Sequence, residues 1–255
     1  MTSIPLLAAA FIFGTLTGSF FWTLAQRMSS GEYKGRPVAL LTKPSHCTSC
    51  GKRINPLYLI PVAGFFLSRM KCPSCGARIS PLYPAAECIS GALCVCTLLS
   101  EGFSLGALCV FLLLSLALVI AWVDYRTMII PDALVAAFAL AALYPAYLAG
   151  DWISSIMGMG LLGALFFVII LFFPGGFGGG DMKFASAIGL FAGFELSIVV
   201  LEAALVSGTV FGVVYAIASR RGFRIRIPFG PFLAAGLFTA VFFGREILLI
   251  YYSVF

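Results

Sequence analysis

Long apolar stretches recur along almost the whole chain, and they restrict the fold more than any other feature of the sequence. A helix needs about 20 apolar residues to cross the roughly 30 Å hydrocarbon core of a bilayer. Inside lipid every backbone N–H and C=O must be paired within the protein, which leaves helices or closed barrels. The stretches are continuous rather than alternating, so the sequence predicts helices. Eight candidate spans are expected, at about residues 4–26, 84–100, 106–123, 132–149, 153–173, 184–194, 196–219 and 229–253.

The composition excludes a water-soluble globular domain. Of the 255 residues, 61% are hydrophobic and only 10% are charged, whereas soluble domains average about 25% charged residues. The predicted fold class is therefore an all-α polytopic membrane protein of about eight transmembrane helices, with a small polar domain. Several stretches, 184–194 among them, are shorter than a perpendicular span, so a tilted, broken or re-entrant element is expected.

The basic residues indicate the orientation in the membrane. Of the 16 Lys and Arg residues, nine lie in the segment 27–78. Arg126, Lys183 and a cluster at 220–226 follow in alternate loops, and only Arg245 falls on the other side. Because basic loops stay in the cytoplasm, the sequence predicts a multi-pass membrane protein with its basic side in the cytoplasm and both termini outside. The net charge of +6 follows from this topology and from contact with membrane lipids, and no motif suggests a nucleic-acid partner.

Four cysteines mark the one long polar segment, residues 27–83. They form two CxxC pairs separated by 21 residues, Cys47 with Cys50 and Cys72 with Cys75, each followed by glycine. Four thiolates at this spacing suit tetrahedral Zn²⁺. A domain this small has too little hydrophobic core to fold stably without a bound metal or a similar crosslink. The alternatives are disulfides, which the cytoplasmic location disfavours, and a redox dithiol, for which no thioredoxin-like pattern is present.

These features predict three parts. Residues 1–26 form a first transmembrane helix, residues 27–83 form a cytoplasmic, zinc-ribbon-like tetracysteine domain that binds structural zinc, and residues 84–255 form the main transmembrane domain.

Three aspartates lie where charge is costly, at the predicted cytoplasmic edge of the membrane. Asp124 closes the third span, Asp132 opens the fourth, and Asp181 follows a glycine-rich turn at 174–180. Each has an ordinary alternative role. Asp132 and Asp181 can cap helix N-termini, and Asp124 can pair with Arg126. The predicted topology nevertheless puts all three at one depth on one face.

Two carboxyl groups brought close together cannot both ionise easily, and they share a proton. Such a pair can hydrolyse a peptide bond: the ionised acid draws a proton from water while the neutral acid hydrogen-bonds the scissile carbonyl. The glycines before Asp181, which include Gly178 and Gly180, let the backbone approach an extended substrate. The chain has one histidine and no GxSxG, HExxH or phosphate-loop motif, so no other catalytic centre competes.

The aspartate segments resemble the two active-site motifs of the bacterial type IV prepilin peptidases, which are GxGD membrane aspartyl proteases. The first runs from Asp124 to Ile130-Pro131-Asp132, and the second is Gly178-Gly179-Gly180-Asp181-Met182-Lys183. The tetracysteine segment, Gly18-Ser19-Phe20 and Ile227-Pro228-Phe229-Gly230-Pro231 are similar to other signatures of that family. The likeness therefore extends over nearly the whole chain.

The resemblance implies a specific reaction. Asp124 and Asp181 would be the catalytic pair of an aspartic endopeptidase. The residues that would shape the site or contact substrate are Pro131, Asp132, Gly178, Gly180 and Lys183. The substrates would be type IV prepilins or pseudopilins, from which a short basic leader is removed at the cytoplasmic edge of the membrane. The protein would then lie in the bacterial cytoplasmic (inner) membrane, with the zinc domain and the active site on the cytoplasmic side.

Members of this family often methylate the new N-terminus with S-adenosylmethionine, and the sequence leaves this activity open. Trp22 stands where such proteins usually have Asn, and Met70 stands where they usually have Gly. Both departures lie in regions associated with methyl transfer. The chain contains no recognisable adenosine-binding motif, and nothing in it indicates an oligomeric state.

Two functions of other classes are the alternatives. An ion-coupled membrane transporter would use membrane carboxylates and broken helices such as 174–194, but transporter acids tend towards the bilayer midplane. A non-enzymatic scaffold that docks partners through the zinc domain would leave the paired acids without a role. The sequence therefore favours the protease.

Overall fold

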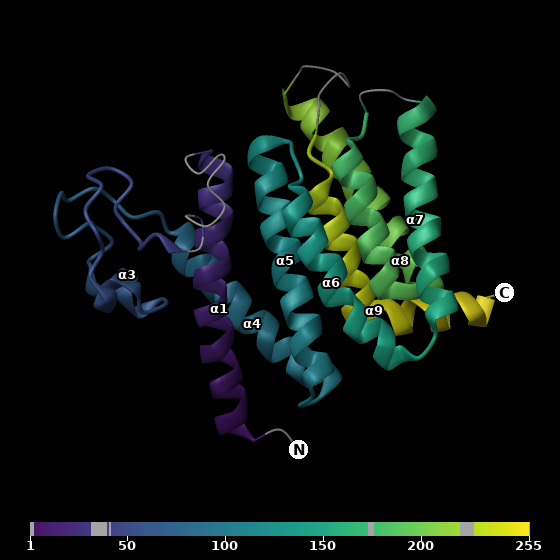
Figure 1. Cartoon of the computed structure of the whole chain (residues 1–255), viewed down its shortest axis with the longest axis horizontal. Helices are drawn as coiled ribbons and strands as arrows, with labels where there is room; N and C mark the ends of the chain where they lie inside the picture. The colour runs from purple at the N-terminus through teal and green to yellow at the C-terminus, as the bar shows by residue number, and fades with distance from the viewer. Residues whose placement is uncertain (1–2, 32–39, 41, 173–175, 220–226, 255) are drawn as a thin grey trace. The chain divides into compact units, whose positions relative to one another are not determined.

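A computed structural model of the chain describes residues 3–31, 40, 42–172, 176–219 and 227–254 (Figure 1). The basic cluster at 220–226 and the start of the glycine-rich turn, at 174–175, lie outside the described residues. Within the described part of the chain the regular elements are helices, without a named strand. The helices and their bounds are α1 (Ile4–Ser30), η1 (Pro56–Leu59), α3 (Ala63–Leu67), α4 (Leu82–Glu101), α5 (Leu105–Thr127), α6 (Asp132–Ala149), α7 (Trp152–Phe172), α8 (Gly179–Ser219) and α9 (Gly230–Val254).

Seven of the described helices are long and apolar enough to cross a membrane: α1 and α4 to α9. The predicted all-α polytopic membrane fold is therefore confirmed. The two stretches expected at 184–194 and 196–219 both belong to α8, which is why about eight predicted spans correspond to seven long helices.

A break at Gly193 divides α8. The 41 residues of this helix would extend about 60 Å if straight, twice the thickness of a bilayer core. Gly193 has a φ of 72°, in the left-handed region that glycine tolerates. The rings of Phe177, before α8, and Phe211, near its end, belong to one chain of aromatic contacts through Phe229 and Phe232. Both ends of α8 thus lie at the same end of the bundle, and α8 is a hairpin that supplies two crossings.

The chain divides into two compact units, Met1–Ala107 and Leu108–Phe255. In the first unit α1 packs on α4 through small residues, because Gly14 lies against Gly91 and Gly18 lies against Ser90. The tetracysteine segment is tied to both helices. The Arg27 guanidinium donates to the Leu40 carbonyl at 2.6 Å, and the Val62 N–H donates to the Glu87 carboxylate on α4. The predicted division at 27 and 84 stays a prediction.

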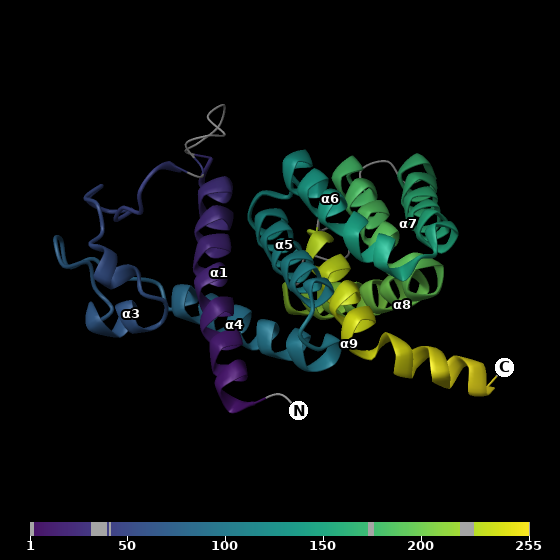
Figure 2. The ribbon, with the colours of Figure 1, turned by 60° about the horizontal axis from the view of Figure 1, so that its bottom comes forward.

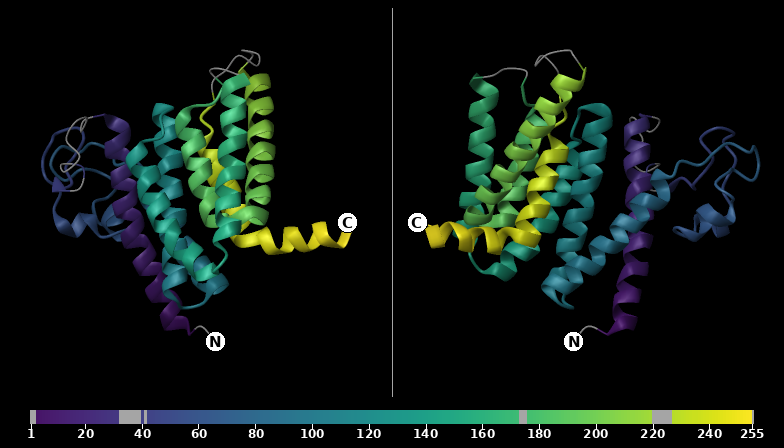
Figure 3. Two further views of the ribbon diagram at one scale, coloured as in Figure 1. Left: turned by 45° about the vertical axis from the view of Figure 1, so that its right-hand side comes forward. Right: turned by 180° about the vertical axis from the view of Figure 1, so that it is seen from behind.

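The second unit is a bundle in which α8 contacts α6, α7 and α9 (Figure 2). Glycines allow close approach here too, since Gly158 of α7 meets Gly189 of α8, and Gly236 of α9 meets Val200. Figure 3 shows the last turns of α9 projecting away from this bundle. Large apolar side chains fill the interior, and the fully buried ones include Leu113, Leu114, Ile120, Phe138, Leu162, Phe184, Ile188, Leu233 and Leu237.

The break in α8 predicts the effect of adding one methyl group. Gly193→Ala should destabilise the protein by about 1–2 kcal/mol, because an alanine would hold a left-handed conformation and its Cβ would lie 2.8 Å from the Ser154 hydroxyl. Thermal unfolding in detergent measures this change. The matched control is Gly160→Ala on α7, where an added Cβ meets nothing within 4 Å. An equal loss of stability in both variants would show that the break is not the cause.

Candidate active site and metal centre

Asp124 is fixed in the last turn of α5 with 4% of its surface exposed. Its Oδ2 accepts a hydrogen bond of 2.8 Å from the backbone N–H of Gly230, at the start of α9. Met128 ends the helix locally, since it adopts a φ of 54° and its N–H donates to the Asp124 carbonyl at 2.7 Å. An alternative role for Asp124 was an ion pair with Arg126. The Arg126 guanidinium instead lies 6.0 Å from the centre of the Trp122 ring.

Asp181 lies in the first turn of α8. Its Oδ2 accepts a hydrogen bond of 2.8 Å from the backbone N–H of Gly178, just before the helix. This contact is the helix-capping role that the sequence left open. The other oxygen, Oδ1, is buried and has no hydrogen-bond partner among the described residues. Helix capping therefore uses only one of the two oxygen atoms of this carboxylate.

The structure brings the two predicted motifs together at one end of the bundle. Asp124 and Asp181 are close enough to interact electrostatically. Ile130 of the first motif lies directly against Gly180 of the second, where an added Cβ would be 2.9 Å from the Ile130 Cβ. The two carboxyl groups thus belong to one site, although they are 57 positions apart in the sequence.

Asp132 and Lys183 connect the same motifs at the surface. The Lys183 Nζ lies 2.8 Å from the Asp132 Oδ1, and 72% of the Asp132 side chain is exposed. Exposed ion pairs contribute about 0–1 kcal/mol, so this pair orients the segments more than it stabilises them. Pro131 precedes α6 as its N-terminal flanking residue.

Gly230 is the site residue to which the sequence analysis gave no role. Phe229 precedes Gly230 and Phe177 precedes Gly178, and their ring centroids are 4.8 Å apart. Phe166 of α7 contacts both rings, at 5.7 and 5.3 Å. One aromatic cluster therefore holds the two backbone N–H groups that bond the two aspartates. The Phe-Gly pair alone could not have shown this, because it also occurs at 13–14, 211–212 and 243–244.

The tetracysteine segment folds into two matching turns. In the first the Gly51 N–H donates to the Cys47 carbonyl, and in the second the Gly76 N–H donates to the Cys72 carbonyl, both at 2.9 Å. The four sulfurs of Cys47, Cys50, Cys72 and Cys75 all lie within 4.8 Å of one another. Tetrahedral zinc with bonds of about 2.3 Å requires sulfurs about 3.8 Å apart. The Cys47 and Cys75 sulfurs are 3.8 Å apart, so this cluster fits zinc.

The charges of the thiols also fit a divalent cation. The backbone N–H groups of Cys50 and Ser49 lower the pKa of the Cys47 thiol to about 6. The pKa of the Cys75 thiol is raised to about 11, because desolvation and the neighbouring thiols outweigh the lowering effect of the Ala77 N–H. Metal ligation requires the thiolate form, and a bound cation would stabilise the negative charge on all four sulfurs.

Comparison with known proteins assigns the family. Residues 12–100 match the family model described as the bacterial peptidase A24 N-terminal domain, and residues 111–213 match the type IV leader peptidase family. A protein of Bacillus subtilis (strain 168) named "Prepilin leader peptidase/N-methyltransferase" is 30% identical over 249 residues, which cover 96% of this chain and 98% of that protein. This chain belongs to the type IV leader peptidase family.

Further members carry the same name. The protein of Burkholderia pseudomallei (strain K96243) is 31% identical, covering 96% of this chain and 87% of its own length. The protein of Pseudomonas putida is 27% identical, with 93% and 91% covered. No solved structure matches this chain. The family confirms the predicted resemblance and a multi-pass peptidase of the inner membrane, and it does not favour the transporter alternative.

The two departures from the family pattern have visible structural settings. Trp22 of α1 packs edge-on against Tyr83 of α4, with ring centroids 6.1 Å apart. Met70 has a φ of 61°, in the left-handed region that disfavours a side chain. A glycine, which type IV leader peptidases usually have at this position, would adopt this backbone conformation without strain.

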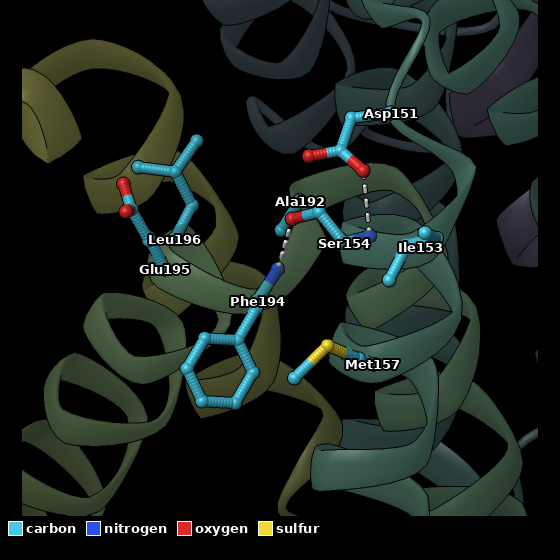
Figure 4. Close-up of a pocket in the computed structure, with 8 residues that line it drawn as sticks. All are labelled: Asp151, Ile153, Ser154, Met157, Ala192, Phe194, Glu195 and Leu196. Atoms are coloured by element: carbon cyan, nitrogen blue, oxygen red, sulfur yellow. Dashed lines mark hydrogen bonds between the residues drawn. The ribbon is translucent and has the colours of Figure 1, made fainter.

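A pocket of about 430 Å³ lies at the start of α7, beside the Gly193 break in α8 (Figure 4). This is the end of the bundle opposite to the two aspartates. Its acidic groups, Asp151 and Glu195, flank the start of α7 and the break in α8. The Asp151 carboxylate accepts from the Ser154 N–H at 2.9 Å, and the Ser154 hydroxyl accepts from the Phe194 N–H at 2.9 Å. These polar groups join helix ends, and the pocket is separate from the leader peptidase motifs.

The contact between Gly230 and Asp124 predicts a second stability change. In Gly230→Ala the new Cβ would lie 2.9 Å from the Asp124 Oδ2, and such overpacking costs about 1–3 kcal/mol. The unfolding temperature in detergent should therefore fall. Gly212→Ala on α8 is the matched control, since its nearest contact would be an ordinary 3.5 Å from Ile227. Unchanged stability in Gly230→Ala would mean that α9 is not held against Asp124.

Proposed function

We propose that this chain is a prepilin leader peptidase in which Asp124 and Asp181 form the catalytic pair. It would act as a membrane-embedded aspartyl endopeptidase that removes the basic leader from type IV prepilins or pseudopilins. The observation that carries this proposal is the meeting of two aspartates, one from each motif, at one end of the bundle, where the Asp181 Oδ1 has no partner among the described residues.

The reaction follows from the two carboxyl groups. The ionised member takes a proton from a water molecule, and the resulting oxygen attacks the scissile carbonyl carbon. The protonated member hydrogen-bonds the carbonyl oxygen and so stabilises the charge that develops there. The C–N bond then breaks as the leaving amine receives a proton from the pair. Because Gly178 and Gly230 each hold one aspartate oxygen, both side chains keep their orientation during the reaction.

The sidedness of the site is part of the proposal. Arg27 lies in the last turn of α1, Arg126 lies in the last turn of α5, and Lys183 lies near the start of α8. Basic residues at these positions favour the cytoplasm. A substrate whose apolar helix lies in the bilayer would present its scissile bond at the cytoplasmic edge, next to the aspartates. The exposed pair of Asp132 and Lys183 would flank this bond, and Gly178 and Gly180 would leave room for an extended peptide.

The catalytic pair is tested by single substitutions. Asp124→Asn and Asp181→Asn should each abolish leader removal, because an amide cannot exchange the proton that the pair must share. The measurement is coexpression with a type IV prepilin, followed by the size and N-terminal sequence of the product. Membrane insertion and the unfolding temperature should persist in both variants.

Asp151→Asn serves as the matched control in the same assay. Asp151 lies in the pocket beside the Gly193 break, away from the two aspartate motifs, and its carboxylate accepts a hydrogen bond from the Ser154 N–H. Asn can keep that bond, so the variant should keep most of its cleavage. Complete processing by Asp181→Asn would remove that residue from the mechanism. Loss of cleavage in all three variants to the same degree would indicate a structural effect of charge removal.

We infer that the tetracysteine cluster binds a structural zinc ion. Four cysteine ligands leave no open position on the metal, so the ion would hold the segment together without taking part in hydrolysis. The cluster lies in the unit formed by α1, α4 and the tetracysteine segment. Its loss should therefore leave the aspartate bundle folded.

The zinc assignment predicts a selective loss of metal. Cys72→Ser should release zinc and make the tetracysteine segment sensitive to proteases, and a strong chelator should do the same, because metal binding and folding of such small domains are coupled. Metal analysis and limited proteolysis measure the two effects. Cys88→Ser, at an exposed position on α4, is the matched control and should retain zinc. Full zinc content in Cys72→Ser would contradict the ligand set.

Methyl transfer is not included in this proposal. The relatives carry N-methyltransferase in their name, and the reaction would need S-adenosylmethionine as the methyl donor. Among the described residues no group is identified that would bind it, and Trp22 and Met70 replace the usual Asn and Gly of the family. Assay of the cleaved pilin for a methylated N-terminus would decide this activity separately from cleavage.

A further inference from the structure

The apolar side of the tetracysteine segment is exposed. The short helices η1 and α3 present five large apolar side chains, which we call the η1–α3 face: Leu57, Leu59, Ile60, Phe66 and Leu67. Phe66 is 60% exposed and Leu67 is 61% exposed. Large exposed apolar side chains gathered on two short helices that contact each other indicate a binding surface or a membrane contact.

The position of this face along the membrane normal follows from the packing of α1 and α4. Gly18 of α1 lies against Ser90 and beside the Ala86 carbonyl of α4, so this part of α4 is level with the middle of α1. Gly18 is nine residues before Arg27, which corresponds to about 13 Å along a helix axis. Since basic residues at the end of a span lie near the headgroups, Gly18 lies within the hydrocarbon region.

A buried carboxylate holds α3 at that level. Glu87, next to Ala86 on α4, is 7% exposed and accepts a 2.6 Å hydrogen bond from the Val62 N–H, immediately before α3. In Figure 1, α3 lies to one side of α1, at about the level of the middle of that helix. The η1–α3 face is therefore at membrane depth, although the segment that carries it is polar overall.

The backbone on both sides of α3 is paired within the protein. An unpaired N–H in hydrocarbon costs several kcal/mol, and the N–H groups from Val62 to Gly64 and from Ser68 to Lys71 donate to oxygen atoms of the protein. These bonds are compatible with contact between α3 and lipid.

Charge identifies the surrounding lipid. Residues 42–86 contain no Asp or Glu. Their basic side chains Lys43, Lys52, Arg53, Arg69, Lys71 and Arg78 are all exposed. Basic residues around an apolar face are typical of segments that lie in the interface and bind anionic headgroups, at about 1 kcal/mol per charge.

We propose that the η1–α3 face inserts into the leaflet next to the C-terminal end of α1, and that the basic residues around it bind anionic phospholipid headgroups. The tetracysteine segment is then an interfacial part of the membrane protein, held at both its apolar and its charged surfaces. This role is independent of the peptidase reaction.

Tryptophan fluorescence in full-length protein tests the proposal. In a parent chain with Trp22, Trp122 and Trp152 replaced by Phe, Phe66→Trp places an indole on the η1–α3 face. The protein is reconstituted in vesicles of phosphatidylcholine and phosphatidylglycerol, with or without bromine on the acyl chains. We expect the indole to lose most of its emission in brominated vesicles and to resist quenching by aqueous acrylamide.

Ser49→Trp is the matched control in the same parent, because Ser49 is an exposed polar residue of the first cysteine turn. Its indole should respond to acrylamide and resist the brominated lipid. Leu67→Trp, on the same face as Phe66, repeats the test if Phe66→Trp does not fold.

Three results would overturn the proposal or part of it. Quenching of Phe66→Trp by acrylamide alone would place the face in water. Protection from both quenchers would mean that protein covers it, either a second copy of the chain or another segment. Equal quenching by brominated vesicles without phosphatidylglycerol would remove the role assigned to the basic residues.

Discussion

Lipid supplies no hydrogen bonds, so every polar group at membrane depth must find its partner within the protein. This constraint governs the positions of the charged residues in the bundle. Asp124 is buried against the Gly230 N–H, Asp181 bonds the Gly178 N–H, and Glu87 bonds the Val62 N–H. Each carboxylate takes its bond from a backbone group outside regular helix or at a helix start. At these three sites, backbone at or outside the end of a helix therefore lies next to a carboxylate.

The same constraint distinguishes a carboxylate with a structural role from one that is available for catalysis. Glu87 is bound tightly and holds two elements together. Asp181 has one oxygen paired and one buried oxygen without a partner in the described structure, an arrangement that is costly in a structural role. Water and a substrate carbonyl would satisfy that oxygen. The cost of the incomplete pairing is consistent with the role proposed for this residue in catalysis.

Close approach of the backbones gives the site its rigidity. The Phe177 and Phe229 rings bring the two glycine N–H groups together, Ile130 packs against Gly180, and the ion pair of Asp132 and Lys183 joins the motifs at the surface. These contacts link α5, α6, α8 and α9 at one end of the bundle. The tetracysteine segment belongs to the other unit, with α1 and α4.

The sequence by itself determined the membrane fold, the four clustered cysteines and the candidate aspartates, because long apolar runs, CxxC spacing and acids at span ends are local patterns. It also indicated a short or broken element near 184–194, where α8 turns at Gly193. It predicted two spans, 184–194 and 196–219, and the structure joins them in α8 through the break at Gly193. The role of Gly230, the partner of Glu87 and the depth of α3 depend on contacts between segments far apart in the chain. Only the tertiary structure decided them, since no local pattern specifies which distant backbone N–H a buried carboxylate will find.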